Sequence, residues 1–280
     1  MDTALNFVGV ELWCKVASPG RPRYGANLAC SPHLRLPMPI HQANDAWSPS
    51  EIAARVESLG VAKAREDLIS VFVLSILAGA FISLGAIFFM VVVTDSQLGF
   101  GVTRLVGGLA FSLGLILVVV AGAELFTGNN LVSMAWASGR IRLGELLRNW
   151  MLVYAGNVVG ALGTAGLVQL GSIGNLGNGA VGEKAMAIGM AKAQLGFVQA
   201  IALGILCNTL VCLAVWLAIG GRSVTDKILG VIFPITAFVT IGSEHCIANW
   251  FFLPYAYLQG LHGVEGYAGG AAQNLFAVTL

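Results

Sequence analysis

Two strings, Gly122-Ala-Glu-Leu-Phe-Thr-Gly-Asn129 and Gly242-Ser-Glu-His-Cys-Ile-Ala-Asn249, repeat the pattern G-x-E-x-x-x-x-N inside two hydrophobic stretches of one chain. Each places a carboxylate, Glu124 or Glu244, where a membrane helix normally carries none, and the second adds His245. Ionisable groups are costly inside a bilayer and therefore mark a functional site. A motif that recurs in two halves of a membrane protein is typical of inverted repeats around a midplane site. The two strings together predict a transport protein.

Composition places the chain in a membrane. Hydrophobic residues make up 57% of the 280 residues and charged residues only 10%, whereas a soluble domain carries about 25% charged residues. The net charge of +1 gives no bias toward nucleic acid. The five cysteines have no spacing that indicates a metal site or a disulfide framework, and the sequence predicts neither cofactor nor metal.

The chain divides into three parts. Residues 1–46 are rich in Pro, Arg and Ser and are predicted to be a disordered leader, or the product of a translation start assigned too early. Residues 47–67 are predicted to form an amphipathic helix on the cytoplasmic membrane surface, capped by Ser50. Residues 68–280 form the predicted pore domain.

Charge-free runs define the spans, because a membrane helix needs about 20 apolar residues. The second and fifth runs are interrupted by the repeated strings, which indicates two broken helices. The predicted spans are Leu68–Thr94, Leu105–Ala123 continued by Leu125–Gly139, Asn149–Leu170, Ala193–Ile219, and Ile228–Ser243 continued by Cys246–Leu258. A third span should follow the second break, but Gly266–Leu280 is too short to cross, so the sixth helix is expected to be truncated.

Basic residues predict the orientation. If the five segments alternate, one side carries most of the Lys and Arg residues, and the positive-inside rule makes that side, with the N terminus, cytoplasmic. The richer side holds Arg55, Lys63, Arg65, Arg140, Arg142, Arg148, Arg222 and Lys227, against Arg104, Lys184 and Lys192 on the other.

Six blocks, in a fixed order, carry a resemblance to a known family. They are Ser112–Gly128, Ala137–Ile141, Tyr154–Leu162, Cys207–Trp216, Gly221–Ser223 and Gly242–Asn249. Together they resemble the formate/nitrite transporters over about Glu51 to Pro254. The resemblance implies an all-α, aquaporin-like, inverted-repeat bundle. It also implies a homopentamer with one pore per protomer, lying in the inner membrane of a bacterium.

The same resemblance implies roles for individual residues. His245 looks like the central pore histidine, Thr127 like its threonine contact, Lys192 like the vestibule lysine, and Asn208 like an asparagine that hydrogen-bonds near the histidine. The apolar constrictions on either side of the histidine would be formed by Phe111, Leu115 and Phe238. The family's pore asparagine on the sixth helix would lie beyond Asn274–Leu280.

Physical chemistry assigns the remaining roles. A monovalent anion cannot pass apolar constrictions as a charge without a large desolvation cost, so it either takes up a proton or is held by a positive group. His245 can serve in either way, because histidine titrates in the physiological range. Glu124 and Glu244 are interpreted as structural groups that cap exposed N–H groups at the breaks or pair with a surface arginine. Asn129 and Asn249 are assigned to the same breaks.

The leading hypothesis is a channel or proton-linked transporter for formate. Nitrite and hydrosulfide are alternatives of similar size and charge, and a truncated, non-transporting fragment is a third. A membrane enzyme using Glu124, Glu244 and His245 is disfavoured, because no nucleophile-plus-base or cofactor signature accompanies them.

Overall fold

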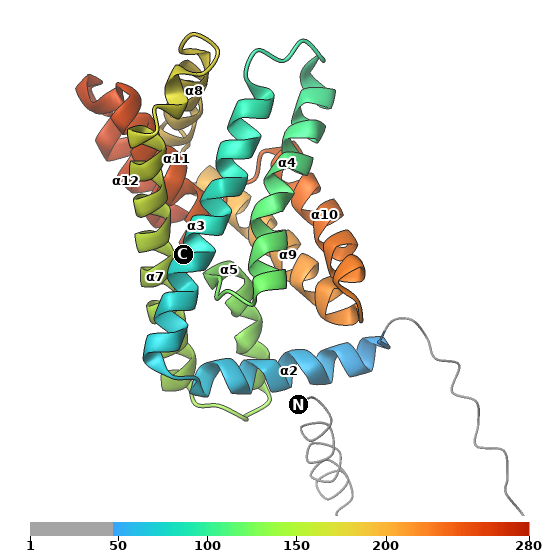
Figure 1. The fold of residues 1–280 in the computed structure, drawn as a ribbon. Helices are drawn as coiled ribbons and strands as arrows, with labels where there is room; N and C mark the ends of the chain where they lie inside the picture. Colours follow the sequence, from blue (N-terminus) through green and yellow to red (C-terminus); the bar gives the residue numbers. More distant parts are fainter. Residues whose placement is uncertain (1–46, 280) are drawn as a thin grey trace, which may run out of the picture. The chain divides into compact units, whose positions relative to one another are not determined.

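The structure is a computed structural model that describes residues 47–279 of the chain. These residues form helices joined by turns, and no strand occurs among them (Figure 1). Within this range, five helices are long and apolar enough to cross a membrane: α3 (Leu68–Val93), α4 (Phe100–Ala121), α7 (Leu143–Leu170), α9 (Phe197–Gly220) and α10 (Val224–Ile241). The predicted leader, 1–46, lies outside the described residues.

The helix α2 (Pro49–Arg65) precedes the first span and lies across one end of the helix bundle (Figure 1). Ser48 and Glu51 start it with a capping box, in which each side chain bonds the other residue's backbone N–H. Ile52, Val56, Gly60 and Ala64 recur at helical spacing and are buried, so α2 rests on one apolar stripe.

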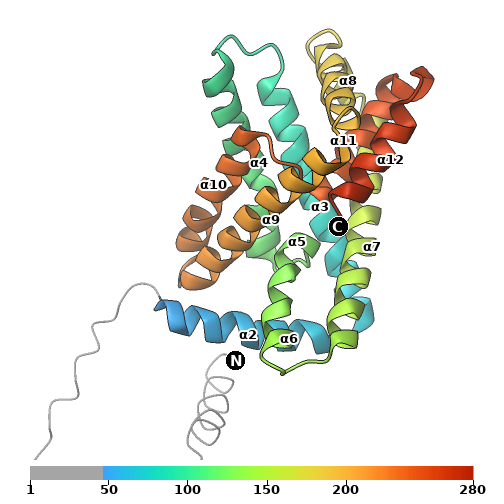
Figure 2. The ribbon, with the colours of Figure 1, turned by 180° about the vertical axis from the view of Figure 1, so that it is seen from behind.

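Both predicted helix breaks are present. The first separates α4 from the short elements α5 (Phe126–Asn129), η1 (Asn130–Val132) and α6 (Ser133–Ala137). The second separates α10 from α11 (Cys246–Gln259). Gly122 and Gly242 end the preceding helices with φ of +73° and +81°, a conformation that glycine adopts without a steric cost. The expectation of an inverted-repeat bundle with two broken helices is therefore confirmed, and Figure 2 shows both breaks in the interior of the bundle.

Glycines allow the spans to approach closely. A Cβ at Gly79 of α3 would lie 2.1 Å from the Asn157 carbonyl oxygen of α7, and one at Gly160 would lie 2.0 Å from the Ile76 carbonyl oxygen. No side chain fits at either point, so the two helix backbones touch. This is the close packing through small residues that membrane helices use in place of a hydrophobic driving force.

Several boundaries differ from the prediction. The third span starts at Leu143 instead of Asn149, because the Glu145 carboxylate accepts the Arg142 backbone N–H at 2.7 Å and starts the helix earlier. In the same way Ser223 and Asp226 cap α10 and move its start to Val224.

The stretch before the fourth span was not predicted to be helical. It contains η2 (Ile173–Asn175) and α8 (Ala180–Ala193), and the span itself begins at Phe197. After α11, the chain continues through η3 (Leu261–Gly263) to α12 (Tyr267–Ala277), which packs against α8 and α9.

Candidate functional site

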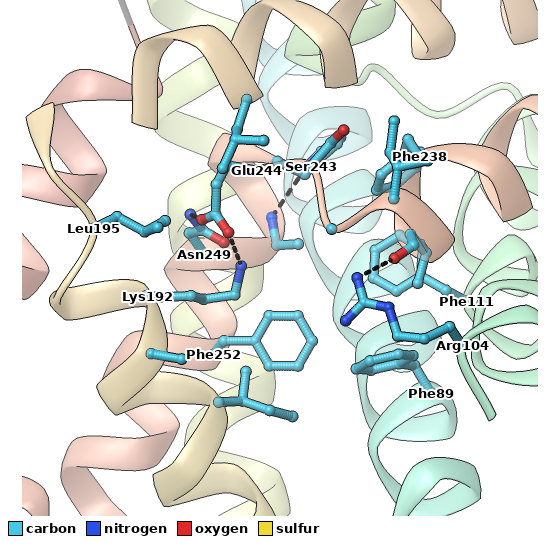
Figure 3. Close-up of a pocket in the computed structure, with 18 of the residues that line it drawn as sticks. Phe89, Arg104, Phe111, Lys192, Leu195, Phe238, Ser243, Glu244, Asn249 and Phe252 are labelled. Carbon is cyan, nitrogen blue, oxygen red and sulfur yellow. Dashed lines mark hydrogen bonds and ion pairs between the residues drawn. The ribbon is translucent and has the colours of Figure 1, made fainter. Parts of the chain in front are cut away.

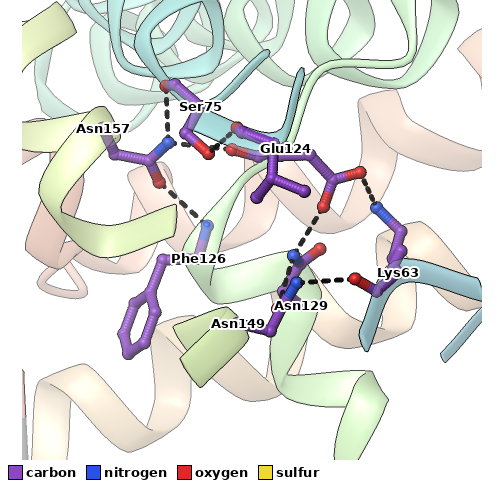
Figure 4. Close-up of polar contacts among 8 residues, drawn as sticks. Lys63, Ser75, Glu124, Phe126, Asn129, Asn149 and Asn157 are labelled. Carbon is purple, nitrogen blue, oxygen red and sulfur yellow. Dashed lines mark hydrogen bonds and ion pairs between the residues drawn. The ribbon is translucent and has the colours of Figure 1, made fainter. Parts of the chain in front are cut away.

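The first break is stabilised by a buried polar node. The Glu124 carboxylate pairs with Lys63 of α2 and accepts the Asn129 Nδ2 at 2.7 Å. Asn129 also donates to the Asn149 Oδ1 at 3.1 Å, and Asn149 donates to the Lys63 carbonyl oxygen at 3.2 Å. Figure 4 shows these four side chains converging from α2, the break and α7.

The second break repeats this node. The Glu244 carboxylate pairs with Lys192 Nζ of α8 at 2.9 Å and accepts the Asn249 Nδ2 at 2.7 Å (Figure 3). Asn249 donates to the Asn274 Oδ1 at 2.7 Å, and Asn274 donates to the Lys192 carbonyl oxygen at 3.1 Å. Each bond of the first node thus has a counterpart here.

The nodes are consistent with a structural role of the glutamates at the breaks, but they change the expected bonding partners. Among the described residues, neither carboxylate accepts a backbone N–H bond, and each pairs with a lysine instead of a surface arginine. The Glu124 and Glu244 side chains are only 5% and 6% exposed. A charge so buried needs an ionic partner and hydrogen bonds, and the node supplies both.

The backbone of the first break is satisfied by Asn157 of α7. Its Oδ1 accepts the Phe126 N–H at 2.9 Å, and its Nδ2 donates to the carbonyl oxygens of Glu124 at 2.8 Å and Ser75 at 2.7 Å (Figure 4). Irregular backbone at membrane depth is stable only when such groups are paired. Asn157 therefore fixes the position of the break between α3 and α7.

His245 links the two breaks. Its Nε2 lies 3.1 Å from the Thr127 Oγ1, and both side chains are buried. Its Nδ1 accepts the Ala248 N–H at 3.1 Å, which caps α11. Since Nδ1 is an acceptor, the neutral ring carries its proton on Nε2, which faces Thr127. A second proton on Nδ1 would oppose the Ala248 donor, so this geometry favours the neutral ring.

Apolar rings lie beside the histidine. The Phe238 ring stacks on the imidazole with centroids 5.9 Å apart, and the Phe111 ring meets Phe238 edge-on at 5.5 Å. Leu115, one turn after Phe111 on α4, is buried as well. Phe238 thus gives His245 an apolar neighbour on the ring face, while Thr127 lies at its Nε2.

Two cavities approach this region. The first, which we call the Lys192 cavity, has a volume of about 430 Å³, and its lining includes Arg104, Phe111, Lys192, Phe238, Glu244 and His245. The second, the Lys63 cavity, has a volume of about 320 Å³, and its lining includes Arg55, Lys63, Leu115, Leu125 and Lys227. Phe111 lines one cavity and Leu115 the other, so the barrier between them is about one helical turn of α4.

The predicted site residues are brought together with one exception. Asn208 on α9 makes no hydrogen bond to His245, and its Oδ1 is buried without a partner among the described residues.

The sequence did not reveal four residues of the site: Lys63, Asn149, Asn274 and Arg104. Asn149 follows Asn129 by 20 residues, and Asn274 follows Asn249 by 25. Because the spacings differ, the sequence does not show that Asn149 and Asn274 have equivalent positions in the two nodes. In the described part of the chain, no group of three His, Cys, Asp or Glu side chains could hold a metal ion.

The sequence profile described as formate/nitrite transporter matches residues 50–280. The Escherichia coli K12 protein named formate channel FocA is 44% identical over 211 residues, which cover 75% of this chain and 74% of that protein. A probable formate transporter of Methanothermobacter thermautotrophicus is 37% identical, with coverage of 83% and 90%.

Two solved structures have the same fold. One, titled a pentameric formate channel with formate bound, is 42% identical with a TM-score of 0.68 and covers 76% of this chain and 90% of its own. Another, titled an FNT family ion channel, is 29% identical with a TM-score of 0.73, and the coverages are 82% and 92%.

Proposed function

The chain belongs to the formate/nitrite transporter family, and we propose that it carries small monovalent anions, formate first, with a proton accompanying the anion past His245. The relatives are named channels and transporters, so this is a multi-pass membrane transport protein and not the membrane enzyme considered as an alternative. The observation that carries the proposal is the buried contact between His245 Nε2 and Thr127 Oγ1, beside the apolar residues Phe111, Leu115 and Phe238.

The proton is proposed to travel with the substrate. A carboxylate would lose its hydration between Phe238 and Leu115, and that cost is removed if formate passes as the neutral acid. His245 Nδ1 is occupied by the Ala248 N–H, so the ring acts mainly as a hydrogen-bond donor through Nε2 and not as a fixed positive charge. The Lys192 cavity supplies the place where the anion gathers before it takes up a proton from the aqueous phase on that side of the membrane.

Uptake of formate into proteoliposomes, followed together with external pH, tests this proposal. The His245→Phe variant removes the donor and should lower uptake by at least about tenfold, the scale of one lost hydrogen bond plus an unpaired polar partner. The His245→Asn variant keeps an N-cap acceptor and a donor, so it should retain slower uptake that still depends on pH.

Either of two results would overturn the assignment. Unchanged formate flux in His245→Phe at every pH would remove His245 from transport. Uptake by His245→Asn that no longer responds to pH would mean that the imidazole itself must titrate. Size-exclusion chromatography of each variant controls for folding.

The choice of formate rests on the names of the two relatives described above, a formate channel and a probable formate transporter. Nitrite and hydrosulfide remain the alternatives, and side-by-side uptake of the three anions by the wild-type protein ranks them. Absence of uptake of all three would favour the alternative that the chain as given does not transport.

We also propose a homopentamer in the bacterial inner membrane with α2 on the cytoplasmic side. The pentameric title of the similar structure supports the assembly, and apolar side chains such as Ile69, Met151 and Leu167 are exposed on the outer faces of the spans for lipid or neighbouring subunits. Native mass spectrometry measures the subunit number. Labelling of a cysteine at Ala54 from each side of a vesicle measures the orientation.

A further inference from the structure

Arg104 is a charged residue that lines the Lys192 cavity. It lies on α4, and Figure 3 shows it on the opposite side of the cavity from Lys192. The lining contains two basic side chains, Arg104 and Lys192, and one carboxylate, Glu244. With His245 neutral, the lining therefore carries one positive charge in excess.

The contacts of Lys192 show where that charge lies. Lys192 Nζ is 2.9 Å from the Glu244 carboxylate, and its side chain is only 15% exposed. This close pair is neutral as a unit, so its field falls off quickly with distance. Arg104 has no ion pair with a carboxylate among the described residues.

Arg104 is also held in place. Its Nε donates to the Thr240 carbonyl oxygen at 2.9 Å and its Nη2 to the Val239 carbonyl oxygen at 2.8 Å. Both acceptors belong to the last turn of α10, where a cation is favoured by the helix dipole. A Cβ at Gly242 would lie 2.7 Å from Nη2, so glycine at this position leaves room for the guanidinium.

The remaining donors of the guanidinium are available to a ligand. A guanidinium has five N–H groups, and the two contacts use one on Nε and one on Nη2. Three N–H groups are left on a side chain that lines the cavity. A planar fork of this kind matches the two oxygens of a carboxylate.

We propose that Arg104 is the residue that recruits the anion into the Lys192 cavity, while Lys192 mainly neutralises Glu244. This inference rests on the proposed function and names the residue that concentrates its substrate. A fixed positive charge in a cavity with low-dielectric walls raises the local concentration of anions. Arg104 therefore sets the formate concentration at which uptake saturates.

Initial rates of formate uptake against concentration test the proposal in proteoliposomes. Arg104→Gln removes the charge and should raise the half-saturation concentration by about three- to tenfold. Arg104→Lys keeps the charge but loses the fork, so its half-saturation concentration should lie between those of wild type and Arg104→Gln. Lys184→Gln is the matched control, because Lys184 lies on α8 but does not line the cavity.

Ionic strength separates recruitment from a purely structural role. The half-saturation concentration of the wild-type protein should rise with added salt, since salt screens the charge, and that of Arg104→Gln should rise less. The proposal is overturned if Arg104→Gln saturates as wild type does, or if Arg104→Lys is as defective as Arg104→Gln and both keep the wild-type salt dependence. A wild-type protein that takes up no formate would instead contradict the proposed function.

Discussion

At the first helix break Leu125 occupies the position that His245 holds at the second, and Thr127 occupies the position of Ile247. The glutamate, the lysine partner and the two asparagines recur at both breaks with the same bonds. The comparison shows that the shared residues build the scaffold, whereas Thr127 and His245, which are not repeated in the other copy, face one another across the breaks. The proposed passage of the anion past His245 thus depends on the residues in which the two copies differ.

Replacing the lysine of either node should have the largest effect on stability, and the effect should differ between the two breaks. Lys192→Met should leave Glu244 buried without its ion pair and lower the free energy of unfolding by about 3 kcal/mol. Lys63→Met should cost less, because the Lys63 side chain is 30% exposed against 15% for Lys192 and water already screens it in part. Denaturation in mild detergent measures both.

A double variant controls this prediction. Combining Lys192→Met with Glu244→Gln removes both charges and should recover much of the lost stability, so the two changes are not additive. Equal losses for Lys192→Met and for the double variant would show that the ion pair is not what stabilises the second break.

Thr127 and Ile247 occupy equivalent positions of the two copies, so matched substitutions there test whether the Thr127 hydroxyl takes part in transport. Thr127→Val removes the hydroxyl that faces His245 Nε2 but keeps the side-chain shape. It should lower formate uptake by about two- to tenfold, as expected for one hydrogen bond of about 0.5–1.5 kcal/mol. Ile247→Val, the matched change in the second copy, should leave uptake near wild type. If the two variants transport equally, the contact between Thr127 and His245 has no role in passage.

The smallest predicted effect is that of acid on the starts of α2 and α8, the helices that carry Lys63 and Lys192. Hydrogen bonds from the Ser48 side chain and backbone lower the pKa of Glu51 below its usual 4.5, and Glu51 is part of the box that starts α2. A carboxyl with a lowered folded-state pKa stabilises fully above its unfolded pKa, and that stabilisation is lost as pH falls through the folded value. Helix α8 begins at Ala180, and its N-cap residue, Gly179, supplies no side-chain cap.

Acid should therefore loosen the start of α2 and leave the start of α8 unchanged. A nitroxide at Ala54, measured by electron paramagnetic resonance, should become more mobile below about pH 4, whereas one at Ala187 should not. Glu51→Gln should make the Ala54 label insensitive to pH. A pH-dependent label in that variant would point to another group.

The broken helices and the polar strings at the breaks could be predicted from the sequence, because a carboxylate in an apolar run is conspicuous and its repetition more so. The lysines that pair with the glutamates of those strings could not be predicted in this way. Lys63 lies in a surface helix and Lys192 in the unpredicted α8, so nothing in their local sequence marks them as the partners of buried carboxylates. The neutral form of His245 depends on the Ala248 N–H, a backbone contact that follows only from the helix start.

The ion pair between Lys63 and Glu124 couples the stability of α2 to that of the first helix break. If α2 separated from the bundle, the Glu124 carboxylate, whose side chain is 5% exposed, would lose its ion-pair partner. Asn149 would also lose the Lys63 carbonyl oxygen to which it donates. Opening of α2 therefore cannot be a local event of low free energy, as the fraying of a surface helix usually is. The surface helix and the first break should exchange their amide hydrogens as one cooperative unit.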